Sequence, residues 1–158
     1  MILGVDVGIN GGYALINGNN ELIECGKLPF RAQKVKKNKY KKVQDVEGTQ
    51  KLFTSLKKAF NVSVAVIENV HPMAGQGVSS TGNFLKAAGI IEGLLKGLDF
   101  EVIKVSPRTW KKALEVDSDK KKSKALAETI FRTTFGTHDI AEAALLALYG
   151  NIVKKQGR

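Results

Sequence analysis

The stretch ILGVDVGINGGYALI, residues 2–16, constrains the fold more than any other part of the sequence. An apolar run over residues 2–7 is interrupted by one charged residue, Asp6, and is followed by a pair of glycines that favours a turn. A second apolar run covers residues 13–16, and a third covers residues 22–28. Short apolar runs separated by turn residues predict three antiparallel strands at the beginning of the chain.

The rest of the chain alternates between strand and helix patterns. β-Branched runs over residues 62–67 and 100–105 predict two further strands, the first of them buried. Helical spacing and capping signals predict helices over residues 45–60, from Ser79 or Ser80 to about residue 95, from Ser106-Pro107 onward, over residues 119–135, and over residues 138–153 with Thr137 as N-cap. This order predicts an α/β fold in which a mixed five-stranded sheet carries helices on both faces, in one domain over residues 1–158.

The formal net charge is +10, because 25 Lys and Arg residues outnumber 15 Asp and Glu residues. Such a charge indicates a polyanionic partner, either nucleic acid or an anionic membrane. Residues 31–42 contain seven Lys and Arg residues and no acid, and a second basic cluster covers residues 120–124. Either cluster alone could be a solvated surface, but two clusters with this net charge favour nucleic acid. Residues 31–42 hold too few large apolar residues to form core, so we expect a flexible loop there.

Several features indicate where the protein works. No apolar run approaches the roughly 20 residues that a helix needs to span a bilayer. The first residues lack the positive region and the uninterrupted apolar run of a signal peptide. The single cysteine, Cys25, excludes an intrachain disulfide and is expected to be a passive residue near a strand. We expect a cytoplasmic protein, in the host cytoplasm if it is viral, with no membrane partner and no small-molecule cofactor.

Four acidic residues have unusual sequence settings. Asp6 lies inside the first apolar run, and Glu68 directly follows the apolar residues VAVI. A carboxylate at the end of a buried strand is costly unless it is paired or binds a metal ion. Asp139 and Glu142 begin the last predicted helix, where their i, i+3 spacing puts them on one face. The rest of that helix is apolar enough to pack on the sheet, so we expect the pair to line the wall of a cleft.

Four carboxylates suit hard cations such as Mg²⁺, with Mn²⁺ as a substitute. Two such ions roughly 3.5–4 Å apart can activate water and stabilise a leaving oxygen at phosphorus, as a phosphodiesterase requires. Each acid also has a structural alternative, because acids in the first turn of a helix interact favourably with its dipole and Glu68 could cap a neighbouring element. The combination of four acids with a basic chain favours a site that holds two ions.

Four motifs resemble those of the RuvC family of Holliday-junction resolvases, and most of all the small RuvC-like endonucleases of phages. They are ILGVDVGINGGYALI, VAVIEN, VSPRTWKK and HDIAEAALLAL. The resemblance covers nearly the whole chain in the same order. It implies a ribonuclease-H-like fold, a homodimer, and Mg²⁺-dependent cutting of branched DNA.

The resemblance also implies which residues form the active site. The family's acids match Asp6, Glu68, Asp139 and Glu142, which are therefore expected to be catalytic and to bind metal. The last acid is usually Asp in the family, and Glu142 is one methylene longer. Some family members use a histidine in this region as a ligand, so a metal-binding role for His138 stays open.

A set of basic and planar side chains is expected to contact DNA. In the family, an aromatic residue in the loop after the second acid enters the crossover, and His71 matches that position. Its ring could stack on a base, or it could only shape the loop. Lys111 and Lys122 match basic positions near the family's active site, and other basic groups near helix starts can contact phosphate. The expected DNA-contacting residues are His71, Arg108, Lys111, Lys112, Lys120 and Lys122.

Two further features have alternative explanations. Trp110 could stack on DNA, but a lone tryptophan more often anchors a helix to the core. Gly89, Gly93 and Gly97 recur every four residues along a predicted helix, where glycine costs roughly 0.5–1 kcal/mol relative to alanine. Such a stripe suggests close approach of another element, which is either the partner's copy of this helix or a neighbour in the monomer.

Other functions remain open at this point. A ribonuclease-H-fold nuclease could act on flaps, forks or RNA–DNA hybrids. An actin-like or sugar-kinase-like ATPase could use Asp6-Val7-Gly8 for phosphate, but 158 residues are too few for the usual two domains, and Glu68 and Asp139 would be unexplained. A non-catalytic protein that binds branched DNA is the last alternative, and the four acids argue against it.

Overall fold

The computed structural model describes residues 1–8, 10–72 and 77–157. Its main sheet has five strands in the order β3-β2-β1-β6-β7. β1 pairs antiparallel with β2 and β2 with β3, whereas β1, β6 and β7 run parallel to one another. The strands are β1 (Ile2–Val5), β2 (Gly12–Ile16), β3 (Leu22–Lys27), β6 (Val64–Glu68) and β7 (Glu101–Val105). The sheet is therefore mixed, as the sequence predicts.

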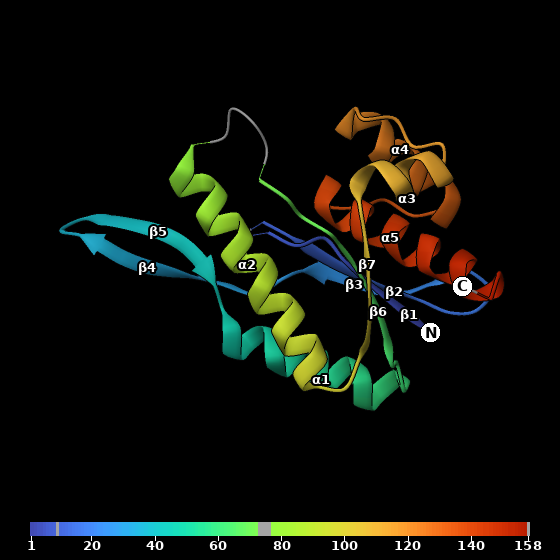
Figure 1. Ribbon diagram of the computed structural model, residues 1–158, viewed down its shortest axis with the longest axis horizontal. Helices are drawn as coiled ribbons and strands as arrows, with labels where there is room; N and C mark the ends of the chain where they lie inside the picture. The colour runs from blue at the N-terminus through green and yellow to red at the C-terminus, as the bar shows by residue number, and fades with distance from the viewer. Residues whose placement is uncertain (9, 73–76, 158) are drawn as a thin grey trace.

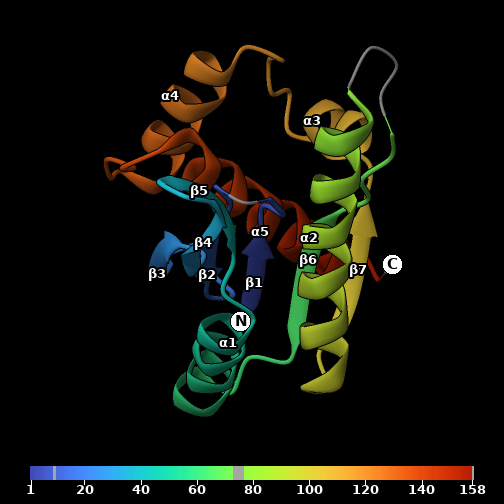
Figure 2. The same cartoon turned by 90° about the vertical axis from the view of Figure 1, so that its left-hand side faces the viewer.

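Helices cover both faces of this sheet, and they are α1 (Val46–Phe60), α2 (Val78–Gly97), α3 (Pro107–Ala113), α4 (Lys120–Phe131) and α5 (His138–Lys155). Figures 1 and 2 show α1 and α2 on one side, and α5 with α3 and α4 on the other. This arrangement confirms the predicted fold class. The caps at Ser106 and Thr137 form as expected, but α2 begins at Val78 after Gly77 and has no side-chain cap.

The alternation of side chains along the strands divides the core in two. Ile2 faces α5 and packs with its apolar residues, such as Leu145. Leu3 and Val5 face the other way, into the core that contains Phe53 of α1 and Ile91 of α2. Because both faces of β1 are buried, the strand reads as a continuous apolar run in the sequence.

Two glycines allow α5 to lie directly on the sheet. A Cβ atom built on Gly4 would lie 1.9 Å from the carbonyl oxygen of Ala143, and one built on Gly12 would lie 2.7 Å from the Cα of Ile140. No side chain fits at either strand position. The backbone of α5 is thus held against β1 and β2, and the first turn of the helix is placed beside the end of β1.

Residues 31–42 form a β-hairpin, so the expectation of a flexible loop was wrong. β4 (Phe30–Lys36) pairs antiparallel with β5 (Lys39–Gln44), and Asn38 adopts a left-handed backbone conformation in the turn, with φ 61°. A lack of large apolar residues excludes a buried strand, but it does not exclude an exposed one. A two-stranded ribbon needs backbone pairing and strand-forming residues such as Val35 and Tyr40, and it can leave both faces exposed. Figure 1 shows the hairpin extending away from the sheet and helices.

In the parts of the chain that the structure describes, no helix is both long enough and apolar enough to cross a membrane.

Candidate active site

The ends of two parallel strands bring the first pair of acids together. Asp6 follows β1 directly, and Glu68 is the last residue of β6. The register pairs Val5 with Ile67, so the residue that follows each of them reaches the same edge of the sheet. Carboxyl ends of neighbouring parallel strands are where open α/β sheets commonly place ligand sites.

The first turn of α5 brings the second pair of acids to the same edge. The hydroxyl of Thr137 accepts a hydrogen bond of 3.4 Å from the backbone N–H of Ile140, which fixes the beginning of the helix. Asp139 and Glu142 then lie one turn apart. A Cβ on Gly12 would be 3.0 Å from the carbonyl carbon of Asp139, so the absence of a side chain there lets this turn approach β2.

Asp6 interacts electrostatically with the other three acids. Burial raises the pKa of Asp6 well above its ordinary value, and repulsion by Glu68, Glu142 and Asp139 raises it further, while Lys120 lowers it. The pKa of Glu68 is also raised, mainly by burial. The cluster is therefore strained when all its members are ionised, and a proton or a cation would relieve it.

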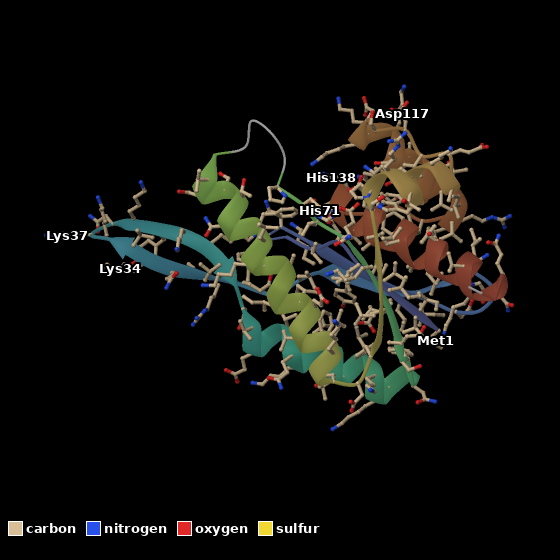
Figure 3. The ribbon with its side chains drawn as sticks, viewed as in Figure 1. Met1, Lys34, Lys37, His71, Asp117 and His138 are labelled. Atoms are coloured by element: carbon tan, nitrogen blue, oxygen red, sulfur yellow. The ribbon has the colours of Figure 1, made fainter. Side chains whose placement is uncertain are left out.

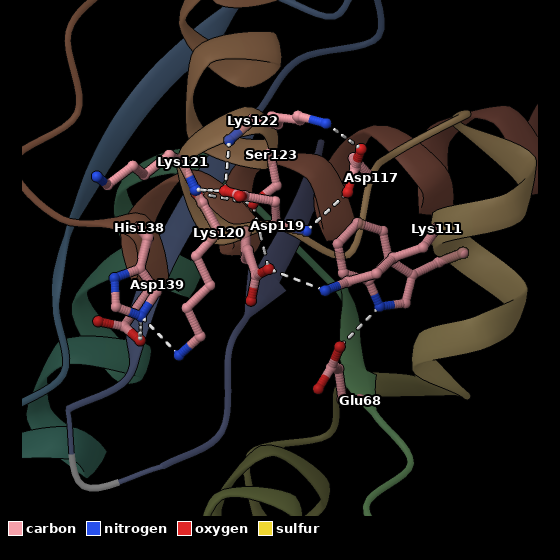
Figure 4. Close-up of polar contacts among 12 residues, drawn as sticks. Glu68, Lys111, Asp117, Asp119, Lys120, Lys121, Lys122, Ser123, His138 and Asp139 are labelled. Carbon is pink, nitrogen blue, oxygen red and sulfur yellow. Dashed lines mark hydrogen bonds and ion pairs between the residues drawn. The ribbon is translucent and has the colours of Figure 1, made fainter.

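Two of the acids are held by side chains of α3. The indole N–H of Trp110 donates a hydrogen bond of 2.7 Å to Oε1 of Glu68. The ammonium group of Lys111 lies 3.0 Å from Oε1 of Glu142, and the hydroxyl of Ser123 approaches the same oxygen at 3.4 Å. Figure 4 draws these contacts at the end of the sheet. α3 therefore fixes the orientation of one carboxylate from β6 and another from α5.

His138 lies between an acid and a lysine. Its Nε2 is 3.0 Å from Oδ1 of Asp139 and 3.1 Å from Nζ of Lys120. A protonated Nε2 donates to Asp139, whereas an unprotonated Nε2 accepts from Lys120, so only one of these hydrogen bonds exists at a time. The contacts hold the imidazole beside Asp139 and are compatible with the metal-binding role that the resemblance leaves open for it.

A cavity of about 370 Å³ opens beside Asp139. It is lined by Lys120, Lys121, Lys124, Gly136, Thr137, His138 and Asp139. The three lysines lie on one side of the acidic cluster. If one phosphodiester of a substrate lies at the carboxylates, these lysines could bind the next phosphate.

The donor set fits a hard divalent cation by its chemistry. Carboxylate oxygens are the ligands that Mg²⁺ and Mn²⁺ prefer, and the repulsion at Asp6 is what a divalent cation would reduce. In residues 1–8, 10–72 and 77–157, however, no three His, Cys, Asp or Glu side chains are close enough to form a ready-made metal site. Glu142 is paired with Lys111 instead, so metal binding by all four acids requires that this contact be exchanged.

The remaining residues expected to contact DNA lie at different distances from the acids. Lys111 and Lys120 reach them, as described above. Lys122 pairs instead with Asp117 at 2.9 Å on the exposed side of α4. Arg108, Lys112 and His71 are exposed, and residues 73–76 of the loop that begins at His71 lie outside the described residues.

The structure decides between alternatives at two sequence features. Trp110 has no exposed surface, which confirms the core-anchoring interpretation and excludes stacking of its ring on DNA. Gly89, Gly93 and Gly97 are exposed on α2, and a Cβ at any of them would have no atom within 4 Å in the described residues. Close packing inside the monomer is therefore the wrong explanation of the stripe, and contact with a partner helix stays a prediction.

Three features of the site were missed in the sequence. The hydrogen bond from Trp110 to Glu68 joins residues 42 positions apart, and no local pattern predicts it. The roles of Gly4 and Gly12 had a signal, because an isolated glycine in a strand often marks close approach of another backbone. Applied to β1 and β2, that rule would have indicated where α5 packs.

Solved structures of Holliday-junction resolvases resemble this chain over nearly its whole length. RuvC of T. thermophilus in complex with a Holliday-junction substrate has 13% sequence identity and a TM-score of 0.71, covering 99% of this chain and 95% of that one. Fowlpox virus resolvase with Holliday-junction DNA has 21% identity and a TM-score of 0.54, covering 97% and 99%. The yeast mitochondrial resolvase Ydc2 has 17% identity and a TM-score of 0.55, covering 98% and 80%.

Sequence comparison adds nothing to this likeness. No protein-family model matches the sequence, and no curated protein does. At these identities the similarity establishes the fold, which confirms the RuvC-like, ribonuclease-H-like architecture that the four motifs implied.

Proposed function

We propose that this chain is a metal-dependent endonuclease that resolves four-way junctions and cuts other branched DNA. One observation supports the proposal above the others: Asp6 interacts electrostatically with Glu68, Asp139 and Glu142 next to a lysine-lined cavity, in a fold shared with Holliday-junction resolvases. The net charge of +10 fits a nucleic-acid substrate.

Asp6, Glu68, Asp139 and Glu142 are the residues that would hold the metal. Two Mg²⁺ ions, or Mn²⁺ in their place, would supply an activated water and stabilise the leaving oxygen at phosphorus. Within the described residues, the carboxylate of Asp6 forms no hydrogen bond or ion pair, whereas the other three acids each have a partner. A cation at Asp6 would therefore have no such contact to displace.

The basic side chains position the substrate. Lys111 and Lys120 lie at the acids and can hold the phosphate that reacts or its neighbour. Arg108, Lys112 and Lys122 are exposed farther out and can contact phosphates along the strand. His71 follows β6 and Glu68 at the surface, where its ring could stack on an unpaired base at the branch point.

The active form in this proposal is a homodimer. A four-way junction has two-fold symmetry, and a two-fold dimer places two active sites on strands of like polarity. The exposed glycines of α2 provide a surface on which a second helix can approach closely, because no side chain of the described residues covers them.

The experiment that tests the function is a substrate panel. End-labelled four-way junction, fork, flap, duplex and RNA–DNA hybrid are incubated with the protein in Mg²⁺, Mn²⁺ or EDTA. We expect symmetric incision of the junction in either metal, weaker cutting of forks and flaps, and none in EDTA. Preferential cutting of the hybrid or the flap would replace junction resolution with a different ribonuclease-H-fold activity. Tight junction binding without cutting in any metal would indicate a non-catalytic binding protein.

A further inference from the structure

The β4–β5 hairpin is a basic ribbon that the proposed active site does not use. Its first strand has seven residues, which at about 3.3 Å each gives a length of roughly 23 Å. Every residue of β4 is exposed, as are the first four of β5. Seven Lys and Arg residues lie between Arg31 and Lys42, with no acid among them. The ribbon therefore presents positive charge on both of its faces.

These charges are not neutralised by the protein itself. Several exposed lysines elsewhere have acidic partners: Lys51 pairs with Glu47, Lys104 with Glu92, and Lys154 with Glu101. Among the described residues, the only hydrogen bond or ion pair made by a hairpin Lys or Arg side chain is that of Lys42. Lys36 lies directly across from Lys39 in the register, and like charges in that position destabilise a strand pair. A polyanion bound along the ribbon would remove this repulsion.

The base of the hairpin is attached to the loop that follows Asp6. Nζ of Lys42 donates a hydrogen bond of 2.7 Å to Oδ1 of Asn10 and lies 3.6 Å from the centre of the Phe30 ring. The backbone N–H of Leu28, two residues before β4, donates to the carbonyl of Gly11 at 2.9 Å. The ribbon thus begins beside the loop that follows Asp6. Figure 3 shows Lys34 and Lys37 at its far end, away from the body of the molecule.

We propose that the β4–β5 hairpin is an arm that binds the phosphates of duplex DNA next to the branch point. This inference rests on the proposed function. A two-stranded ribbon has dimensions that fit the major groove of B-DNA, where it passes between two rows of phosphates. Its length of roughly 23 Å corresponds to about seven base pairs at 3.4 Å each. Lysines contact phosphates without reading bases, so the arm adds affinity that does not depend on sequence.

A simpler explanation makes a different prediction. Lysines on the exposed edges of a ribbon prevent it from pairing with another strand, and that role concerns aggregation only. Under that explanation, neutral replacements would change solubility and leave DNA binding as it was. The two explanations are therefore separated by a binding measurement.

The test compares two variants of equal charge in EDTA, so that DNA is bound and not cut. The arm variant is Lys34→Gln, Lys36→Gln and Lys41→Gln, which leaves the Lys42 contact intact. The control is Lys51→Gln, Lys58→Gln and Lys155→Gln, on α1 and the far end of α5. Affinity for a four-way junction is measured against salt. Because each phosphate contact contributes about 0.9 to the slope, the arm variant should lose up to about 2.7, and the control none.

The length of the junction arms shows where the contacts lie. On junctions whose arms are only about five base pairs long, the difference in slope between the arm variant and the wild type should be smaller than on long arms, because the far end of the ribbon then extends past the DNA. Lys→Arg replacement at the same three positions should restore the wild-type slope on long arms. Circular dichroism melting shows whether each variant is folded.

Several results would overturn the inference. An arm variant with the wild-type slope on long arms would refute it, as would an equal loss on short and long arms. Loss of binding to anionic lipid vesicles with DNA binding unchanged would assign the ribbon to a membrane surface instead. These outcomes are distinct from failure of the proposed function, in which the wild type binds no junction or cuts none in Mg²⁺.

Discussion

The indole N–H of Trp110 donates a 2.7 Å hydrogen bond to Oε1 of Glu68. Trp110 is fully buried, so its ring is fixed by the core that α5 forms with the sheet. The bond lowers the pKa of Glu68 and partly offsets the rise that burial causes. A residue that cannot touch DNA thus orients one of the four acids, and we regard Trp110 as a positioning residue.

Trp110→Phe keeps an apolar ring in the core and removes the donor. We expect the variant to fold, with a free energy of unfolding lower by about 1–3 kcal/mol, because a buried carboxylate loses its partner. We also expect junction cutting to need a higher Mg²⁺ concentration for half-maximal rate, since Glu68 is no longer held. Lower stability with an unchanged Mg²⁺ dependence would show that Trp110 is only structural.

Asp6→Asn should change the stability of the metal-free protein. The pKa of Asp6 in the folded protein is above its unfolded value, so the folded state binds the proton more tightly and loses stability as pH rises through the raised pKa. In EDTA near neutral pH, the variant should therefore have the higher melting temperature, and the difference should shrink as pH falls. Mg²⁺ should raise the melting temperature of the wild type more than that of the variant.

Scanning calorimetry over a pH series measures both effects, and Asp99→Asn serves as the control. Asp99 is exposed and has a left-handed backbone, with φ 57°, which asparagine tolerates. A metal-free Asp6→Asn protein that melts below the wild type at neutral pH would contradict the electrostatic description of the site.

Gly12→Ala should disturb the position of α5. The added Cβ would lie 2.7 Å from the Cα of Ile140 and 2.8 Å from its nitrogen, so the first turn of the helix must move. We expect a loss of about 1–3 kcal/mol in unfolding free energy and slower cutting, because Asp139 and Glu142 move with that turn.

Gly18→Ala is the matched control for that substitution. A Cβ at Gly18 meets no atom within 4 Å in the described residues, and Gly18 does not have a left-handed backbone. The control should therefore gain about 0.4–1 kcal/mol, because alanine restricts the unfolded chain. Equal effects of the two substitutions in urea unfolding would show that close packing of α5 on β2 does not matter.

Gly93→Leu tests the predicted dimer. Nothing in the described monomer obstructs a side chain at this position, so the folded monomer should keep or gain stability. If two copies of α2 pack across the glycines, the variant should become monomeric in light scattering and lose paired incision while it still nicks single strands. A variant that stays dimeric and makes paired incisions would place the dimer surface elsewhere.

The sequence predicts the fold well because its signals are local. The apolar runs, the Thr137 cap and the Ser106-Pro107 start each act within a few residues, and each corresponds to an observed element. It also predicts that Asp6 and Glu68 come together, because both end strands that lie parallel in the sheet.

The sequence does not predict two kinds of feature: contacts between residues far apart in the chain, and elements that contain no core residues. The contacts of Trp110 with Glu68 and of Lys111 with Glu142 span 42 and 31 positions, and they depend on how α3 packs. The β4–β5 hairpin has few large apolar residues, and its strands are defined by pairing with each other instead of burial. Lys122 follows Lys120 in the same turn of α4, but its side chain points toward Asp117, because the orientation of α4 decides which of its lysines faces the acids.

The role of Asp6 in cutting is measured with an end-labelled four-way junction in Mg²⁺, on which Asp6→Asn is compared with the wild type and with Asp99→Asn. Asp6 interacts with all three of the other acids, whereas the basic surface that is proposed to bind DNA is unchanged in this variant. We expect Asp6→Asn to bind the junction with nearly wild-type affinity and not to cut it, while Asp99→Asn cuts normally. Cutting by Asp6→Asn at a rate near that of the wild type would contradict the assignment of the active site.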